Sequence, residues 1–179
     1  MAMDTEKEAF IAFLLQGSQA ALKPGNDEPG TSPGWTMRRY AEGDRLLLTK
    51  RQHVTLAATP YRIVFTTLAF YGSTEEPKPE DAIWHLMYNG RVLEASAALN
   101  GLEPPQRAGL VQSLEDFLTK VLLANDDPTQ MRGPPAYEDG DWVYICEQKG
   151  DFVQFEGTET VLYKDEVVYA SSFKGQIRV

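Results

Sequence analysis

Residues 137–145 read YEDGDWVYI, and residues 40–48 read YAEGDRLLL. In both stretches a tyrosine and an acidic residue precede Gly-Asp, and a run of β-forming residues follows. Gly and Asp are common in tight turns, so each stretch is typical of a turn that leads into a strand. Two such turns in one chain indicate that a structural unit occurs twice.

An amphipathic helix is predicted ahead of each turn. In the first, Thr5 and Glu8 have capping-box spacing, and an apolar stripe continues as far as Leu22. The second begins at Pro104-Pro105, and its stripe ends before Asn125. The two stripes match when the following residues are aligned: Phe10 with Leu114, Phe13 with Phe117, Leu14 with Leu118, and Gly17 with Val121.

A third match lies downstream, where Trp84–Val92 aligns with Tyr169–Ile177, each with two aromatic residues ahead of a glycine. Three matches in the same order make an internal duplication the simplest explanation. We expect one α+β domain over residues 1–179, with pseudo-repeats over about 5–99 and 104–179. Each repeat would supply a helix and about three antiparallel strands. The prediction is a roughly six-stranded antiparallel sheet with two helices.

The second repeat also resembles a known family. The residues that carry the resemblance are Arg132-Gly133-Pro134, Tyr137, Gly140-Asp141, Gly150-Asp151-Phe152, Phe155, Gly157, Glu159, Tyr163, Val168-Tyr169 and Gly175. They resemble an uncharacterised bacterial domain family of unknown function, whose members are sometimes fused behind XRE-type helix-turn-helix regulators. The resemblance implies a bacterial origin and supports the expected fold, and it implies no activity.

Composition disfavours several classes of partner. Asp and Glu outnumber Lys and Arg by 26 to 17, and the formal charge of -9 disfavours binding to nucleic acid and to anionic membranes. The basic pairs Arg38-Arg39 and Lys50-Arg51 are expected to be solvated. No secretory signal or membrane-spanning run is apparent, and the single cysteine, Cys146, allows no internal disulfide, so we expect a cytoplasmic protein.

The usual catalytic and metal-binding patterns are missing from the sequence. His53 and His85 are the only histidines, and neither has a cysteine or carboxylate at ligand spacing. Cys146 lacks the Gly-rich or helix-start context that lowers a thiol pKa, so we expect it to be buried and unreactive. No nucleophile elbow or phosphate-binding loop is recognisable. We therefore predict no metal, no cofactor and no catalytic residue.

Four carboxylates keep an enzymatic alternative open. Asp44 and Asp141 occupy equivalent places in the two repeats, so a pseudo-twofold could bring them together as an acid/base pair. Glu156 and Glu159 flank Gly157 and would complete a carboxylate site in a small hydrolase or isomerase. The simpler interpretation is that both aspartates perform ordinary turn chemistry and that the glutamates alternate on an exposed strand.

Aromatic residues mark a candidate binding face. Residues four apart on a strand point to one face, so the predicted strands gather these side chains on one side of the sheet: Trp84, Tyr88, Trp142, Tyr144, Tyr169 and Phe173. Two helices cover one face only, and the other face must meet loops, a partner or a ligand. The alternative is that these aromatics lie beneath the helices as core.

The leading functional hypothesis is a noncatalytic binding module. It would recognise a small molecule or a protein partner through its sheet face or through the cleft between the two copies, with a homodimer as one form of such a partner. Besides the carboxylate enzyme, a further alternative is an acidic inhibitor or immunity-like protein that binds a basic partner through its charge.

Overall fold

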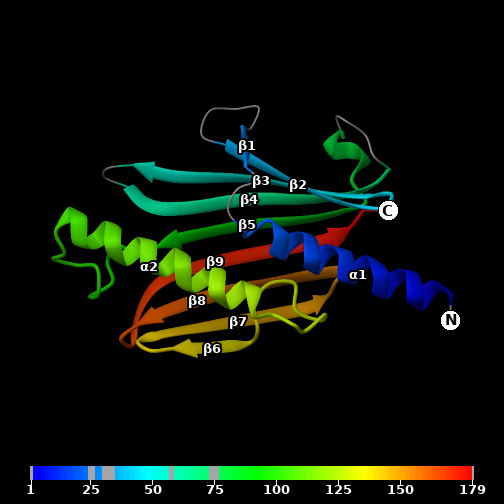
Figure 1. Cartoon of the computed structure of the whole chain (residues 1–179). Coiled ribbons are helices and arrows are strands. Elements are labelled where there is room, and N and C mark those ends of the chain that lie inside the picture. The colour runs from blue at the N-terminus through cyan, green and yellow to red at the C-terminus, as the bar shows by residue number, and fades with distance from the viewer. Residues whose placement is uncertain (1, 24–26, 30–34, 57–58, 73–76, 179) are drawn as a thin grey trace.

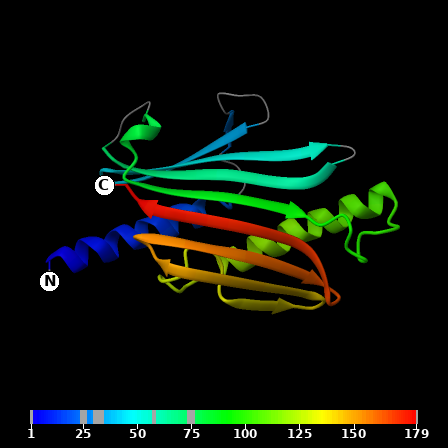
Figure 2. The same cartoon turned by 180° about the vertical axis from the view of Figure 1, so that it is seen from behind.

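The computed structural model describes residues 2–23, 27–29, 35–56, 59–72 and 77–178. They form one antiparallel sheet with two long helices on one of its faces (Figures 1 and 2). The elements are α1 (Ala2–Ala20), β1 (Glu28–Pro29), β2 (Trp35–Glu42), β3 (Arg45–Leu56), β4 (Thr59–Tyr71), the 3-10 turn η1 (Pro79–Asp81), β5 (Trp84–Val92), α2 (Pro104–Leu123), β6 (Ala136–Asp139), β7 (Trp142–Asp151), β8 (Gln154–Tyr163) and β9 (Glu166–Ile177).

The sheet has nine strands in the order β1-β2-β3-β4-β5-β9-β8-β7-β6, so the predicted six-stranded sheet is wrong. The missing strands are β1, which pairs with β2, and the first arms of the two Gly-Asp hairpins, β2 and β6. These arms lie toward the edges of the sheet and carry many polar residues, as in AYED for β6. They therefore lack the apolar alternation by which a strand is recognised in a sequence.

The two halves of the sheet meet at an antiparallel pair, β5 and β9. Four strands, β2 to β5, follow α1 after the short β1, and four, β6 to β9, follow α2. Tyr88 of β5 lies directly opposite Phe173 of β9, and these are the two residues that the sequence comparison aligns. The register therefore relates the halves by an approximate twofold axis at this pair, while their common origin stays a prediction.

The geometry of the two hairpin turns explains why the Gly-Asp motif predicts a turn at each position. Gly43 and Gly140 adopt φ angles of 60° and 61°, a left-handed conformation that glycine adopts at little cost. Each glycine joins two adjacent arms of a hairpin, since Glu42 pairs with Arg45 and Asp139 with Trp142. The two hairpins therefore begin alike.

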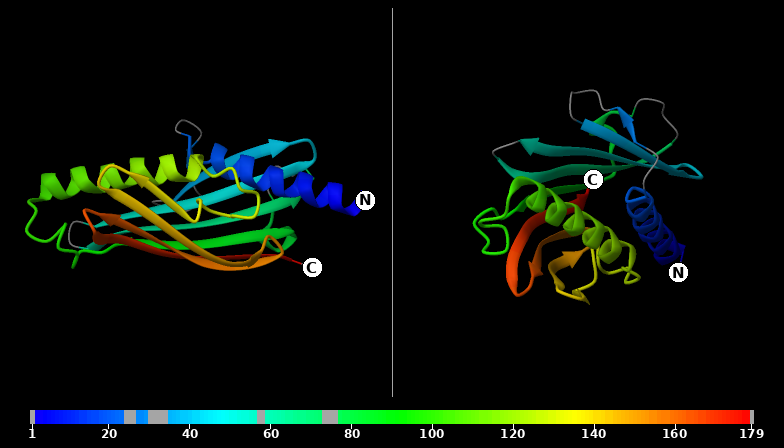
Figure 3. Two further views of the ribbon diagram at one scale, coloured as in Figure 1. Left: turned by 90° about the horizontal axis from the view of Figure 1, so that it is seen from below. Right: turned by 60° about the vertical axis from the view of Figure 1, so that its left-hand side comes forward.

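The main core lies between the helices and the sheet. Both predicted helical stripes are buried there, with Phe13 of α1 and Val121 of α2 almost inaccessible to solvent. Seen along the sheet, α1 and α2 lie on the same side of the strands (Figure 3). A smaller buried cluster of Leu46, Leu48, Leu68, Phe70 and Ala82 lies on the opposite face, because strand residues of that parity point away from the helices. No helix among the described residues is long and apolar enough to span a membrane.

Candidate ligand-binding site

The candidate aromatic residues lie on the helix-covered face of the sheet. Trp84, Tyr88, Tyr144, Tyr169 and Phe173 are buried. Trp142 is half-buried, and its ring stacks on Phe117 of α2 at 5.4 Å between centroids. These side chains therefore form core beneath the helices, the alternative considered from the sequence, and do not form an exposed surface.

A buried carboxylate lies among these aromatics. Glu159 of β8 is 1% exposed, and its two oxygens accept four hydrogen bonds. Tyr88 Oη and Ser171 Oγ donate to Oε2 at 2.7 and 2.9 Å, while Tyr144 Oη and Arg132 Nε each donate to Oε1 at 2.9 Å. Burial by itself raises the pKa of Glu159, but the Arg132 charge and the donated hydrogen bonds outweigh it and hold the pKa below its ordinary value.

The tyrosines of this cluster act as neutral donors. Burial, followed by the nearby Glu159 charge, raises the pKa of Tyr88, Tyr144 and Tyr169. Because Tyr88 donates to Glu159, the 2.6 Å contact between the Tyr169 and Tyr88 hydroxyls is a hydrogen bond that Tyr169 donates. The Tyr144 hydroxyl also accepts the Gly133 N–H at 3.2 Å. The network thus joins four strands, β5, β7, β8 and β9, to the segment that follows α2.

Arg132 connects this network to the other half of the sheet. Its side chain is 9% exposed, and its Cζ lies 4.5 Å from the Tyr88 ring centroid and 5.0 Å from that of Phe65. The two rings stack at 4.4 Å with an interplanar angle of 11°. Asn125 holds the backbone in place by donating from Nδ2 to the Arg132 carbonyl at 2.6 Å. The guanidinium therefore covers an aromatic platform built by β4 and β5.

A cavity of about 70 Å³ lies beside Arg132, between the helices and strands β3 to β5. Both halves of the chain line it. Its apolar walls come from Ala21, Leu22, Ile63, Phe65, Leu86, Leu118 and Leu122, and its polar lining from Ser18, Thr49, Arg51, Thr67, Tyr88, Glu115, Thr119 and Arg132. One water needs about 10–15 Å³ of such space, so the cavity fits a few waters or a small organic group.

Arg51 contributes a buried polar atom without a partner to this lining. It is half-buried on β3, and its Nε is buried with no hydrogen-bond partner among the described residues. Burial lowers the pKa of Arg51; the Glu115 charge opposes that shift, whereas Arg38 and Arg132 add to it. The expectation that Arg51 is solvated was wrong, because its strand parity directs it to the helix-covered face.

The carboxylates of the enzymatic alternative do not converge. The turn at Asp44 adjoins the Tyr71 end of the sheet, whereas the turn at Asp141 adjoins the start of β9, at the opposite end. Antiparallel pairing of β5 with β9 requires this, because a twofold axis at the sheet centre sends equivalent turns to opposite ends. Glu156 and Glu159 also point to opposite faces, since they lie three residues apart on one strand.

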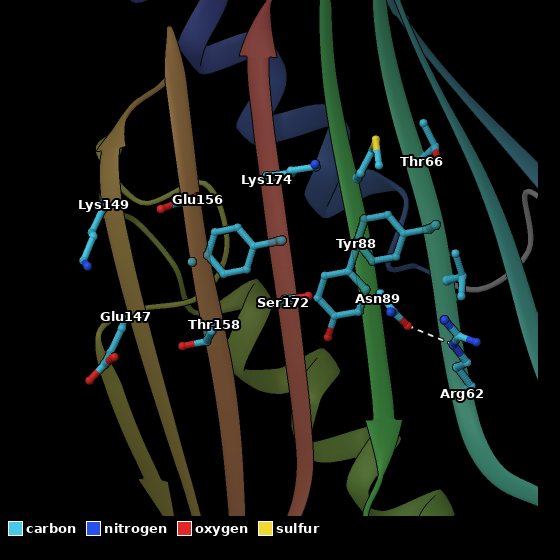
Figure 4. Close-up of a pocket in the computed structure, with 15 residues that line it drawn as sticks. Arg62, Thr66, Tyr88, Asn89, Glu147, Lys149, Glu156, Thr158, Ser172 and Lys174 are labelled. Atoms are coloured by element: carbon cyan, nitrogen blue, oxygen red, sulfur yellow. Dashed lines mark hydrogen bonds between the residues drawn. The ribbon is translucent and has the colours of Figure 1, made fainter.

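The outer face of the sheet carries a broad groove of about 630 Å³ with both charged and apolar residues in its lining (Figure 4). Lys149, Glu156 and Lys174 lie side by side on β7, β8 and β9, so opposite charges are neighbours across the strands. Arg62 donates to Asn89 Oδ1 at 2.9 Å. Lysine, glutamate and lysine therefore alternate across three neighbouring strands of this groove.

The remaining reactive residue types lie apart. His85 is half-buried on the outer face of β5, and burial, then Arg178 and Lys174, lowers its pKa. The side chain of His53 lies outside the described residues. Cys146 is buried, and burial, then Glu159, raises the pKa of its thiol to about 11. Among the described residues, no three His, Cys, Asp or Glu side chains gather as they would around a metal ion.

Reasoning from the sequence missed the Arg132–Glu159 pair as a site. The signal was present in β8, where Phe155, Glu159 and Val161 share one parity and the first and last are apolar. A glutamate on the apolar side of a strand has to be buried with partners. Arg132, Glu159 and Tyr169 were also among the residues that carry the family resemblance, but nothing in their spacing showed that they meet.

Comparison with known proteins identifies a family whose function is unknown. The family model described as "Domain of unknown function (DUF5680)" matches residues 63–177. That range contains β5, α2 and all of the second half, together with the Arg132–Glu159 pair. Neither a curated protein nor a solved structure matches the chain.

Proposed function

The chain belongs to the DUF5680 family, whose function is unknown, and from its geometry we propose that it is a noncatalytic module that binds a small molecule. The binding site would be the cavity between the two halves, beneath the helices. The observation that carries the proposal is the buried, unpartnered Nε of Arg51 on the wall of that cavity.

An unpartnered donor in such a place favours an occupant. A buried donor without an acceptor costs about 1–3 kcal/mol, and a bound acceptor group would remove that cost. Apolar walls with a few polar groups are also the usual lining of small-molecule sites. A ligand placed there would contact α1, α2 and the sheet together.

The buried carboxylate supports a binding role over a catalytic one. Glu159 already accepts from Tyr88, Ser171, Tyr144 and Arg132, so its oxygens are committed to the fold. Its pKa lies below the ordinary value, whereas a general acid or base working near neutral pH needs a raised one. Glu159 therefore suits holding the Arg132 segment in place.

The test is a thermal-denaturation screen of the full chain against small molecules of acidic, amide, amine and uncharged classes. At least one compound should raise the unfolding midpoint, since a ligand at a hundred times its Kd adds about 2.7 kcal/mol. Ser18→Leu enlarges a half-buried cavity residue of α1 and should abolish this gain.

The matched control is Ala12→Leu, which adds a leucine at an exposed position of the same helix. It should keep the gain in full. The proposal is wrong if no compound stabilises the chain, or if Ser18→Leu binds as tightly as Ala12→Leu.

A further inference from the structure

Two arginines, Arg51 and Arg132, supply hydrogen-bond donors to the lining of the cavity. Arg51 and Arg132 carry donors only. The hydroxyls of Thr49 and Thr67 lie 3.1 Å apart, so one of them donates to the other. The ligand group that best fits this wall is therefore one that accepts hydrogen bonds.

The two arginines differ in how their charge is balanced. Arg132 donates from Nε to the fully buried Glu159 at 2.9 Å, a compact ion pair. Burial lowers the pKa of Arg51, the charge of Glu115 of α2 opposes that shift, and the Arg51 Nε lacks an acceptor among the described residues. A carboxylate matches the planar fork of a guanidinium, so it is the acceptor that Arg51 binds best.

The rest of the lining limits the size and charge of that ligand. Ile63, Leu86 and Leu118 present hydrocarbon, which suits an alkyl chain. The volume of about 70 Å³ holds roughly five waters, close to the size of a short organic acid. A second carboxylate on the ligand would meet Glu115, which also lines the cavity.

We infer that the cavity takes a short monocarboxylic acid, whose carboxylate accepts from Arg51 and whose alkyl chain lies against the leucine and isoleucine walls. The inference rests on the proposed function and names its ligand class. It assigns Arg51 as the residue that distinguishes an acid from its neutral analogue, and Glu115 as the residue that disfavours dicarboxylates.

The experiment compares matched probes by titration calorimetry on the full chain at neutral pH. The probes are straight-chain monocarboxylates of about three to six carbons, their primary amides, and the dicarboxylates of equal length. A carboxylate accepting from a guanidinium should bind about ten times more tightly than the amide, as expected for a hydrogen bond between charged groups. The dicarboxylate should bind more weakly than the monocarboxylate.

Variants assign the preference to Arg51. Arg51→Met should remove the preference, so that acid and amide bind alike, and Arg51→Lys should keep part of it because the charge remains without the fork. Arg62→Met changes an exposed arginine on the outer face and should leave the preference intact. Circular dichroism melts establish that each variant is folded before it is titrated.

The outcomes separate this inference from the proposed function. If amides bind as tightly as acids to the wild-type chain, the ligand class is wrong and the cavity remains a binding site for another class. If Arg51→Met keeps the full preference for acids, the assignment of Arg51 is wrong. If no small molecule of any class binds the chain or stabilises it in the screen, both the proposed function and this inference are wrong.

Discussion

Thr67 in β4 and Glu159 in β8 occupy matching positions in the two halves of the sheet. Thr67 pairs with Leu86, two residues before Tyr88, and Glu159 pairs with Ser171, two residues before Phe173. Both are buried beneath the helices. One position ends in a short hydroxyl, and the other ends in a carboxylate that collects four hydrogen bonds.

The difference shows how one backbone pattern can serve two purposes. In the second half, the long Glu159 side chain reaches Arg132 and closes the space around itself. In the first half, the shorter Thr67 lines a cavity together with Arg51. The same register therefore yields a rigid network on one side and an open space on the other, and the open side is where we place the ligand.

The largest expected effect concerns the core that both halves share. Trp84 is 2% exposed, its Nε1 donates to the Phe152 carbonyl at 3.2 Å, and Trp84→Ala should cost about 3–5 kcal/mol of unfolding free energy. Met87→Ala, on the exposed outer side of the same strand, should cost about 0.5 kcal/mol or less. Urea denaturation of both variants measures the contrast. Similar losses would mean that Trp84 is not core.

The next effect tests the comparison itself. Glu159→Gln keeps the shape of the side chain but leaves the buried Arg132 charge without its partner, so it should cost about 3 kcal/mol. Thr67→Val at the matching position loses only the hydrogen bond to Thr49 and should cost about 1 kcal/mol. Equal costs in chemical denaturation would remove the distinction between a closed half and an open half.

A smaller effect follows from pH. The pKa of Glu159 is lower in the folded chain than its ordinary value of 4.5. The ionised carboxylate therefore stabilises the fold fully above pH 4.5. This contribution is lost as the pH falls from 4.5 through the pKa of the folded state. The wild type should lose up to about 1.4 kcal/mol per pH unit more than Glu159→Gln in that range. Unfolding free energies from pH 7 to pH 3 measure the difference. Parallel curves for the two proteins would contradict the ion pair.

The smallest effect is expected at Arg51. Arg51→Met removes a buried donor that lacks an acceptor and keeps the aliphatic stem, so stability in the absence of ligand should change by about 1 kcal/mol or less, in either direction. Arg62→Met on the outer face serves as the exposed control. A loss above about 2 kcal/mol at Arg51 alone would show that its guanidinium is already satisfied in the fold.

The helices and the hairpin turns could be predicted from the sequence, because short stretches of residues determine them. The stripes on α1 and α2 are visible because helical spacing brings Phe13 and Val121 to buried faces, and the hairpins are visible because Gly43 and Gly140 need left-handed φ angles. Strands β2 and β6 were not predicted from the sequence, because hydrogen bonding to a neighbouring strand, and not apolar alternation, defines them as strands.

The candidate site was harder to predict from the sequence, because residues distant in the chain form it. The burial of Glu159 could be read from the parity of β8, but its partners come from four separate segments that only the tertiary fold brings together. Thr67 lines the cavity at Arg51 where the other half of the sheet has the longer Glu159, and that correspondence appears only once the strands are in register. The spacing of residues within one segment of sequence does not reveal such a cavity.

The most direct test of the cavity as a ligand site follows the two arginine Nε–H groups by nuclear magnetic resonance. Without ligand, the Arg132 Nε–H should exchange slowly with solvent because it is bonded to Glu159, and the Arg51 Nε–H should exchange faster. On saturation with the tightest-binding compound of the screen, the Arg51 signal should shift and become protected while the Arg132 bond persists. If the compound binds but leaves Arg51 unchanged and shifts signals of the outer face instead, the ligand site lies elsewhere and the account is wrong.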